Sequence, residues 1–146
     1  MKSTTYVLSG AIAAPADAVF ALLTDPARLP EWYPGCSEVK TKGSSLKKGE
    51  RFTLRFQTRT RIRERELQVI EYAAPSTFGW TELGPRGGSK TFFKLQFGGG
   101  STAVTMKHIW APHGLFAWLR GALVRKAQIQ RQFDGALQNI RKILTQ

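Results

Sequence analysis

The sequence predicts an α+β fold: a curved antiparallel sheet of about seven strands, with two short helices and one long C-terminal helix enclosing a cavity. Three observations predict it. An alternating N-terminal segment precedes two proline-broken helical stretches, a central region repeats strand-length segments between turns, and the last segment has helical periodicity. The 146 residues match the length of one domain, so residues 1–146 are expected to form a single domain.

The N-terminal strand is predicted because apolar side chains alternate with smaller or polar ones, at Tyr6, Leu8 and Ile12. After Pro15, apolar residues recur at helical spacing. Pro26 and Pro30 then divide this stretch into two short helices that end near Trp32.

Six further strands are expected between residues 36 and 112, where glycine-, proline- and serine-rich turns separate alternating segments. The alternating bulky residues are Phe52, Leu54, Phe56, Phe78, Trp80, Phe93, Leu95, Phe97, Val104, Met106, His108 and Trp110. From Leu115 to Leu144 the apolar spacing changes to three and four residues, which indicates one long amphipathic helix. This helix is expected to cover the concave face of the sheet, because its apolar stripe has no other partner.

Composition narrows the possible partners and location. Twenty-two Lys and Arg against 10 Asp and Glu give a formal charge of +12, which favours anionic partners or surfaces. A lone cysteine, Cys36, excludes an internal disulfide and a CxxC-type zinc site, and is compatible with a reducing cytoplasm. No apolar run is long enough to span a bilayer, so we expect a cytoplasmic protein.

Several local motifs resemble one known superfamily. They are Ala-Pro-Ala-Asp-Ala-Val-Phe at residues 14–20, Leu-Thr-Asp-Pro at 23–26, Leu-Pro-Glu-Trp-Tyr-Pro at 29–34, Val-Ile-Glu-Tyr at 69–72, Gly-Ser-Thr-Ala-Val-Thr at 100–105, and the helix at 133–143. The chain resembles the START-like superfamily, also called SRPBCC, and within it the polyketide cyclase/dehydrase-like branch, over nearly its whole length. The resemblance implies a helix-grip fold with a cavity between sheet and long helix. It also implies binding of lipids, sterols, quinones or polyketides, which some members cyclise or dehydrate.

The cavity is expected to be apolar with a few orienting polar groups. Its predicted lining is Trp32, Phe56, Trp80, Phe93, Met106, His108, Trp110, Phe116 and Leu119. Because residues two apart in a strand share a face, His108 should point inward with Met106. There it could donate to a ligand carbonyl or move a proton, or it could be a wall histidine bonded to a neighbour.

Two carboxylates are candidates for acid/base chemistry beside His108. Glu64 and Glu66 share the parity of Ile62 and Ile70, which would direct them into the cleft. Leu67 has the opposite parity, however, so the two glutamates could equally face outward, and a bulge near Glu66 would reconcile the pattern. Glu82 is a third inward candidate, although its place beside a turn favours a solvated rim.

A basic stripe is predicted on the hairpin around residue 60. Arg59, Arg61, Arg63 and Arg65 are expected on the face opposite Phe52, on the outside of the sheet. They could contact phosphates or an anionic membrane surface, or serve only to keep the protein soluble. A nucleic-acid partner is disfavoured because the aromatic residues alternate inward, away from any stacking platform.

No cofactor or metal site is expected, since His108 and His113 lack metal-site spacing and no carboxylate pair surrounds them. Cys36 is expected to be structural. Three functional hypotheses remain open: binding of a hydrophobic or aromatic small molecule (a lipid, polyketide or quinone-like compound), a cyclase or dehydratase that uses acid/base chemistry, and a partner-binding protein with a vestigial cavity. Oligomeric state has no signal in the sequence.

Overall fold

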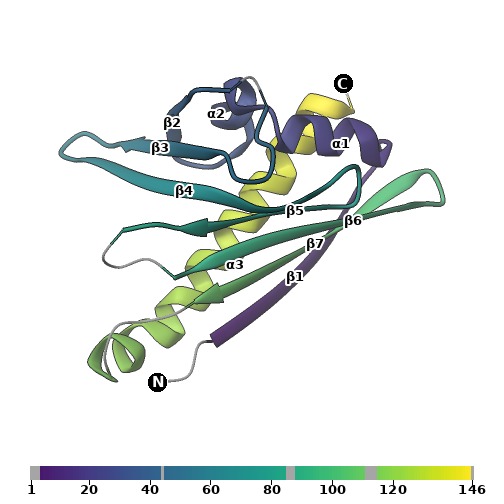
Figure 1. Cartoon of the computed structure of the whole chain (residues 1–146). Coiled ribbons are helices and arrows are strands. Elements are labelled where there is room, and N and C mark those ends of the chain that lie inside the picture. Colours follow the sequence, from purple (N-terminus) through teal and green to yellow (C-terminus); the bar gives the residue numbers. More distant parts are fainter. Residues whose placement is uncertain (1–3, 44, 85–87, 111–114, 146) are drawn as a thin grey trace.

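The computed structural model describes residues 4–43, 45–84, 88–110 and 115–145, and the side chains of all of these except 115–123. Its strands form a seven-stranded antiparallel sheet in the order β1-β7-β6-β5-β4-β3-β2 (Figure 1). The strands are β1 (Thr4–Ile12), β2 (Cys36–Thr41), β3 (Arg51–Gln57), β4 (Ile62–Ala73), β5 (Thr77–Glu82), β6 (Lys90–Gly98) and β7 (Ser101–Trp110). The predicted curved sheet and its six central strands are confirmed.

The helices also follow the predicted order. The two short helices after β1 are α1 (Ala16–Leu23) and α2 (Leu29–Trp32), joined by a 3₁₀ turn at Pro26–Arg28, and the long helix is α3 (Leu115–Leu144). Figure 1 shows α3 crossing one face of the sheet, with its C-terminal end beside α1. The predicted helix-grip fold is therefore the fold of this chain.

The second half of α3 is held against the rest of the molecule by polar and close apolar contacts. Asn139 Nδ2 donates to the carbonyl of Trp32 at 3.1 Å, and Arg141 Nε donates to the carbonyl of Ala11 at 2.9 Å. A Cβ atom at Gly10 would overlap Leu137 Cδ1, so the missing side chain lets the helix lie directly on β1. These contacts fix the position of the helix over the sheet.

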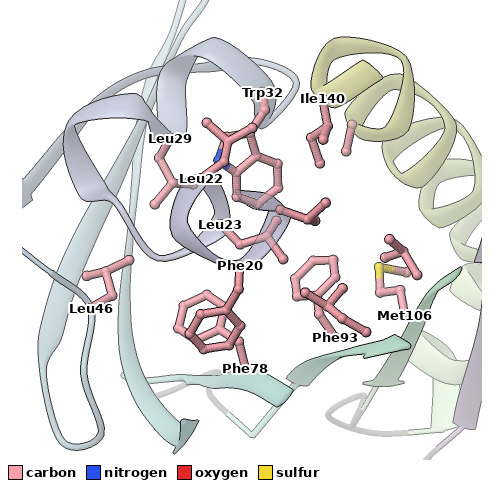
Figure 2. Close-up of a cluster of buried hydrophobic side chains, with 14 of the residues drawn as sticks. Phe20, Leu22, Leu23, Leu29, Trp32, Leu46, Phe78, Phe93, Met106 and Ile140 are labelled. Carbon is pink, nitrogen blue, oxygen red and sulfur yellow. The ribbon is translucent and has the colours of Figure 1, made fainter. Parts of the chain in front are cut away.

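The hydrophobic core is concentrated where α1, α2 and the C-terminal half of α3 meet the sheet. Figure 2 shows side chains from all four regions in one cluster, among them Phe20, Trp32, Phe78, Phe93 and Ile140. Each fully buried side chain of this size stabilises the fold by about 1.5–3 kcal/mol. This end of the fold is closed by packing, which leaves the open space beneath the preceding turns of α3.

The register of β4 decides which of its side chains face the helix. In the pairing with β3, Phe52 lies opposite Leu67, Leu54 opposite Arg65, and Phe56 opposite Arg63. Directly opposed residues share a face, so Arg63 and Arg65 lie on the inner face with these apolar partners. The expected bulge exists, but it lies between Val69 and Glu71 rather than near Glu66.

Candidate functional site

A cavity of about 780 Å³ lies between the sheet and α3. Its walls come from α2, from the inner faces of β3 to β7, and from α3 between Arg125 and Ala136. This volume is within the range of small-molecule binding pockets, about 300–1,000 Å³. The space is thus large enough for a drug-sized or lipid-sized ligand.

Five aromatic residues form a connected belt along the cavity. The ring centroids of Trp80 and Phe93 are 5.5 Å apart, those of Trp32 and Tyr33 are 5.6 Å apart, and Tyr33 lies 6.0 Å from Phe56 and 6.1 Å from Trp80. All five line the cavity. Edge-to-face and tilted pairs at these distances hold one another in place and present a rigid apolar surface.

His108 lies on β7 and is the histidine of this wall. Its Nδ1 is hydrogen-bonded to Thr91 Oγ1 at 2.9 Å, and its Nε2 is buried with no hydrogen-bond partner among the described residues. Burial, followed by the charges of Arg125 and Arg65, lowers the pKa of His108 to about 4. The ring is therefore neutral at pH 7, and Nε2 is left to donate or accept one hydrogen bond according to the tautomer.

Arginines are the main charged residues of the cavity. Two come from β4, one directly precedes that strand and two come from α3; they are Arg63, Arg65, Arg61, Arg125 and Arg131. Glu82 is the carboxylate among the described lining residues, whose charged side chains sum to a formal +4. The electrostatic potential of the cavity therefore favours anions.

Two of these arginines stack on aromatic rings. The guanidinium carbon of Arg65 lies 5.5 Å from the centroid of Phe56, and that of Arg125 lies 5.6 Å from the centroid of Trp110. Burial and the nearby charge of Arg65 lower the pKa of Arg125, and Glu82 partly offsets this. Arg65 on β4 and Arg125 on α3 thus both line the cavity, and the charge of one acts on the other.

Comparison with known proteins places the chain in a family. The model of the family described as polyketide cyclase/dehydrase and lipid transport matches residues 4–145. The chain belongs to this family. A search of curated protein sequences gives no significant match.

Solved structures share the fold of this polyketide cyclase/dehydrase-family protein. Protein NE0264 from Nitrosomonas europaea is 16% identical with a TM-score of 0.79, and the match covers 97% of this chain and 94% of that one. The polyketide-cyclase-like protein Cgl2372 from Corynebacterium glutamicum is 26% identical with a TM-score of 0.70, over 99% and 93% of the two chains. Protein Ms6760 from Mycobacterium smegmatis is 16% identical with a TM-score of 0.74, over 99% and 97%.

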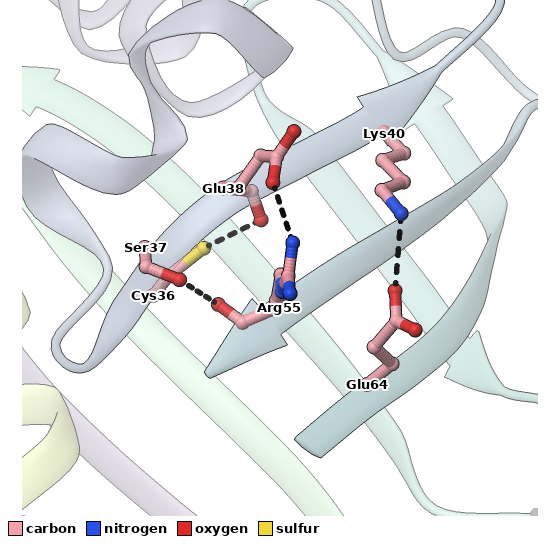
Figure 3. Close-up of polar contacts among 6 residues, drawn as sticks. All are labelled: Cys36, Ser37, Glu38, Lys40, Arg55 and Glu64. Carbon is pink, nitrogen blue, oxygen red and sulfur yellow. Dashed lines mark hydrogen bonds and ion pairs between the residues drawn. The ribbon is translucent and has the colours of Figure 1, made fainter. Parts of the chain in front are cut away.

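The structure corrects the placement of both candidate glutamates. The side chains of Glu64 and Glu66 are 49% and 54% exposed on the outer face of the sheet. There Lys40 Nζ lies 3.6 Å from Glu64 Oε2, as Figure 3 shows, and Arg51 Nη1 lies 3.8 Å from Glu66 Oε1. The expectation that they project into the cleft is wrong because neither residue that sets its parity marks the inner face: Ile70 lies at the bulge and Ile62 is exposed.

The basic stripe is corrected for a different reason: the prediction extends the parity of Phe52 across the turn, whereas the register pairs even-numbered residues of β3 with odd-numbered residues of β4. Arg61, Arg63 and Arg65 line the cavity instead of the outer face, and Arg59 lies exposed in the turn between β3 and β4, outside the cavity wall. The outer face of this hairpin carries paired charges, including Arg55 Nη1 at 3.3 Å from Glu38 Oε2 (Figure 3). On this hairpin, Arg61, Arg63 and Arg65 therefore carry their charge into the cavity wall.

The remaining predicted cavity residues divide into three groups. Those that line the cavity are Trp32, Phe56, Trp80, Phe93, Met106 and His108. Trp110 is not among the described residues that line the cavity; it lies at the end of β7, and the guanidinium of Arg125 lies over its ring. Phe116 and Leu119 lie outside the residues whose side chains are described.

Some lining residues were not expected from the sequence. Arg125 lies four residues before Ile129, so it falls on the apolar stripe of α3. This helical spacing in the sequence could have predicted that Arg125 faces the cavity. Glu82 lines the cavity although a solvated rim was expected for it. Tyr33 also lines the cavity, and burial raises the pKa of its hydroxyl, which keeps it protonated.

Cys36 lies at the start of β2 and is not among the residues that line the cavity. Its side chain is buried, its Sγ donates to the carbonyl of Glu38 at 3.4 Å, and burial raises the pKa of the thiol. Within the described ranges, no cluster of three His, Cys, Asp or Glu residues could hold a metal ion. No helix in the part of the chain that is described is long and apolar enough to cross a membrane.

Proposed function

We propose that the protein binds a hydrophobic or aromatic small molecule, such as a lipid, polyketide or quinone-like compound, in the cavity beneath α3. The observation that carries the proposal is the aromatic belt around a space of about 780 Å³. Apolar walls of this kind gain free energy from ligand burial, at about 25 cal/mol per Å² of apolar surface. The family, which includes lipid transport proteins, supports the same class of ligand.

Binding can be tested with the uncharged probe N-phenyl-1-naphthylamine, whose fluorescence rises in apolar sites. We expect saturable binding by the wild-type protein, together with a copurified ligand in native mass spectrometry. Ala136→Phe places a ring in the cavity wall and should weaken binding, whereas Ala127→Phe, on the exposed side of the same helix, should not. Gln128→Trp, at a more exposed lining position, serves if Ala136→Phe does not fold. Folded wild-type protein that shows no saturable probe binding would contradict the proposal.

A second candidate function is a cyclase or dehydratase that uses His108 in acid/base chemistry. It is favoured by the buried Nε2 of His108, which has no partner among the described residues and belongs to the cavity wall. The carboxylate available to it there is Glu82, since Glu64 and Glu66 face outward. A neutral His108 could accept a proton from an acidic carbon or donate a hydrogen bond to a carbonyl, according to its tautomer.

Incubation with poly-β-keto thioesters, followed by mass spectrometry for loss of water, distinguishes the two functions. An enzyme should convert the substrate and lose turnover in His108→Gln, whereas a binding protein should retain the substrate unchanged. Unchanged substrate in the wild-type complex would contradict the enzymatic function and leave the binding function intact.

A further inference from the structure

The charges of the cavity wall are not balanced by the chain itself. All ten Asp and Glu residues lie in the described part of the sequence, because residues 1–3, 44, 85–87, 111–123 and 146 contain none. Glu82 is the one of these ten that lines the cavity. The ion pairs within 4 Å that the described residues form involve Arg28, Lys40, Arg51 and Arg55. The five cavity arginines therefore have no carboxylate partner among the described residues.

Two cavity atoms in this region also lack hydrogen-bond partners. Nε of Arg125 and Nε2 of His108 are both buried without a partner among the described residues. Burying a charged or polar group without a partner is costly, and the like charge of Arg65 nearby adds to that cost. A bound anion would supply the missing acceptor and counter-charge at once.

We propose that the ligand of the cavity is an anionic amphiphile, with a carboxylate or phosphate group bound by Arg65 and Arg125 and an apolar body against the aromatic belt. This inference rests on the proposed function, since it names the chemical class of the ligand for the same cavity. His108 Nε2 lies on the same wall and contributes a further hydrogen bond to the anionic group in the tautomer that carries a proton on Nε2.

The distribution of charge favours a small molecule inside the cavity over an anionic surface outside it. On the outer face, Arg51 and Arg55 are each paired with a glutamate. Arg65 and Arg125 are half-buried, whereas Arg61, Arg63 and Arg131 are exposed and would attract the anion toward the opening. We therefore assign the anionic group and the apolar body to one molecule that enters the cavity.

The test is displacement of N-phenyl-1-naphthylamine by matched competitors at neutral pH. Dodecanoate and dodecyl phosphate carry both tail and anion, dodecanol carries the tail alone, and acetate carries the anion alone. We expect at least one of the two anionic amphiphiles to displace the probe at a concentration roughly tenfold or more below that of dodecanol, as one or two charge-assisted hydrogen bonds would give. The stronger of the two identifies carboxylate or phosphate as the preferred group, and acetate should not displace the probe.

Variants assign the effect to the two arginines. Arg65→Gln combined with Arg125→Gln should abolish the preference for the anionic amphiphile, measured within that variant as the ratio of the concentrations at which dodecanol and the anionic amphiphile displace the probe. Arg51→Gln removes the same charge from the outer face and should keep the preference. Arg125→Lys, which keeps a charge but not the fork of donors, should reduce the preference partly, and it serves if the double variant does not fold.

Three outcomes have distinct meanings. Saturable probe binding with equal displacement by dodecanol and both anions would overturn the anionic ligand and leave the proposed function standing. A preference that persists in the folded double variant would overturn the assignment to Arg65 and Arg125. Absence of probe binding to the folded wild-type protein would overturn the proposed function itself.

Discussion

Lowering the pH should reduce the free energy of unfolding of this protein, in part through His108. Replacing His108 should remove the part of this reduction that its protonation causes. His108 is mostly buried in the cavity wall, beside Thr91 and near two arginines that oppose a further positive charge. Protonation of the folded protein would therefore place an imidazolium where neither water nor a carboxylate stabilises it. The perturbation is a pH series compared between the wild type and His108→Gln.

The sign and size of the effect follow from the two pKa values. In the folded protein the pKa of His108 is lowered to about 4, whereas the ordinary value of 6.5 applies to the unfolded chain. Between these values the unfolded chain binds a proton that the folded chain does not, so stability falls as the pH falls. At about 1.36 kcal/mol per pKa unit, and allowing for partial exposure, the loss from pH 7 to pH 4 is about 2–3 kcal/mol. Above about pH 7.5 both states are neutral at this residue and it contributes no pH dependence.

Urea unfolding at half-unit pH steps from 4 to 8 measures this directly. The stability difference between wild type and His108→Gln should change by about 2–3 kcal/mol across the window, and the subtraction cancels the carboxylates common to both. Histidine NMR titration supplies an independent pKa, with the variant assigning the His108 resonance. A flat difference between the two proteins, or a folded-state pKa near 6.5, would refute the argument that burial and the two arginines hold His108 neutral.

Three further predictions concern packing and the cavity. Phe133→Ala should lower the free energy of unfolding in urea by about 3 kcal/mol. This value is at the lower end for a buried ring because Phe133 also borders the cavity. A loss under about 1 kcal/mol would contradict its place in the core. Gly10→Ala should lower the free energy of unfolding by about 1–3 kcal/mol because the Cβ of the new alanine would overlap Leu137. Gly98→Ala is the neutral control, because a Cβ there meets open space and the φ of Gly98 is not positive. Equal losses in the two variants would show that Leu137 moves aside at no cost. Trp80→Phe should shrink the change in tryptophan fluorescence that N-phenyl-1-naphthylamine causes, and an unchanged amplitude would place the bound probe away from Trp80.

Local patterns in the sequence were sufficient to predict the elements and much of the cavity wall. Alternation at Phe52 and Leu54, or at Phe78 and Trp80, depends only on the two-residue period of a strand. The inward direction of His108 followed from the same period, because Met106 is two residues away and apolar. Motifs around Pro15 and the closing helix predicted the fold because they reflect caps and turns, whose geometry is set by near neighbours.

Strand pairing, in contrast, decided the charge of the cavity. The sequence alone determined that Arg65 and Glu66 face opposite sides of β4, since neighbouring residues in a strand always do. Which side faces the helix was decided by tertiary structure, because the pairing that places Leu54 opposite Arg65 brings even-numbered residues of β3 and odd-numbered residues of β4 to one face. The bulge after Val69 separately removes Ile70 as a guide to the side on which the glutamates lie. Arg65 and Arg125 likewise come together only when α3 lies across the sheet. A one-residue difference in register exchanges the two faces of a strand. The free energy that selects one register depends on partners distant in the sequence. That selection places the arginines, and not the glutamates, in the cavity wall.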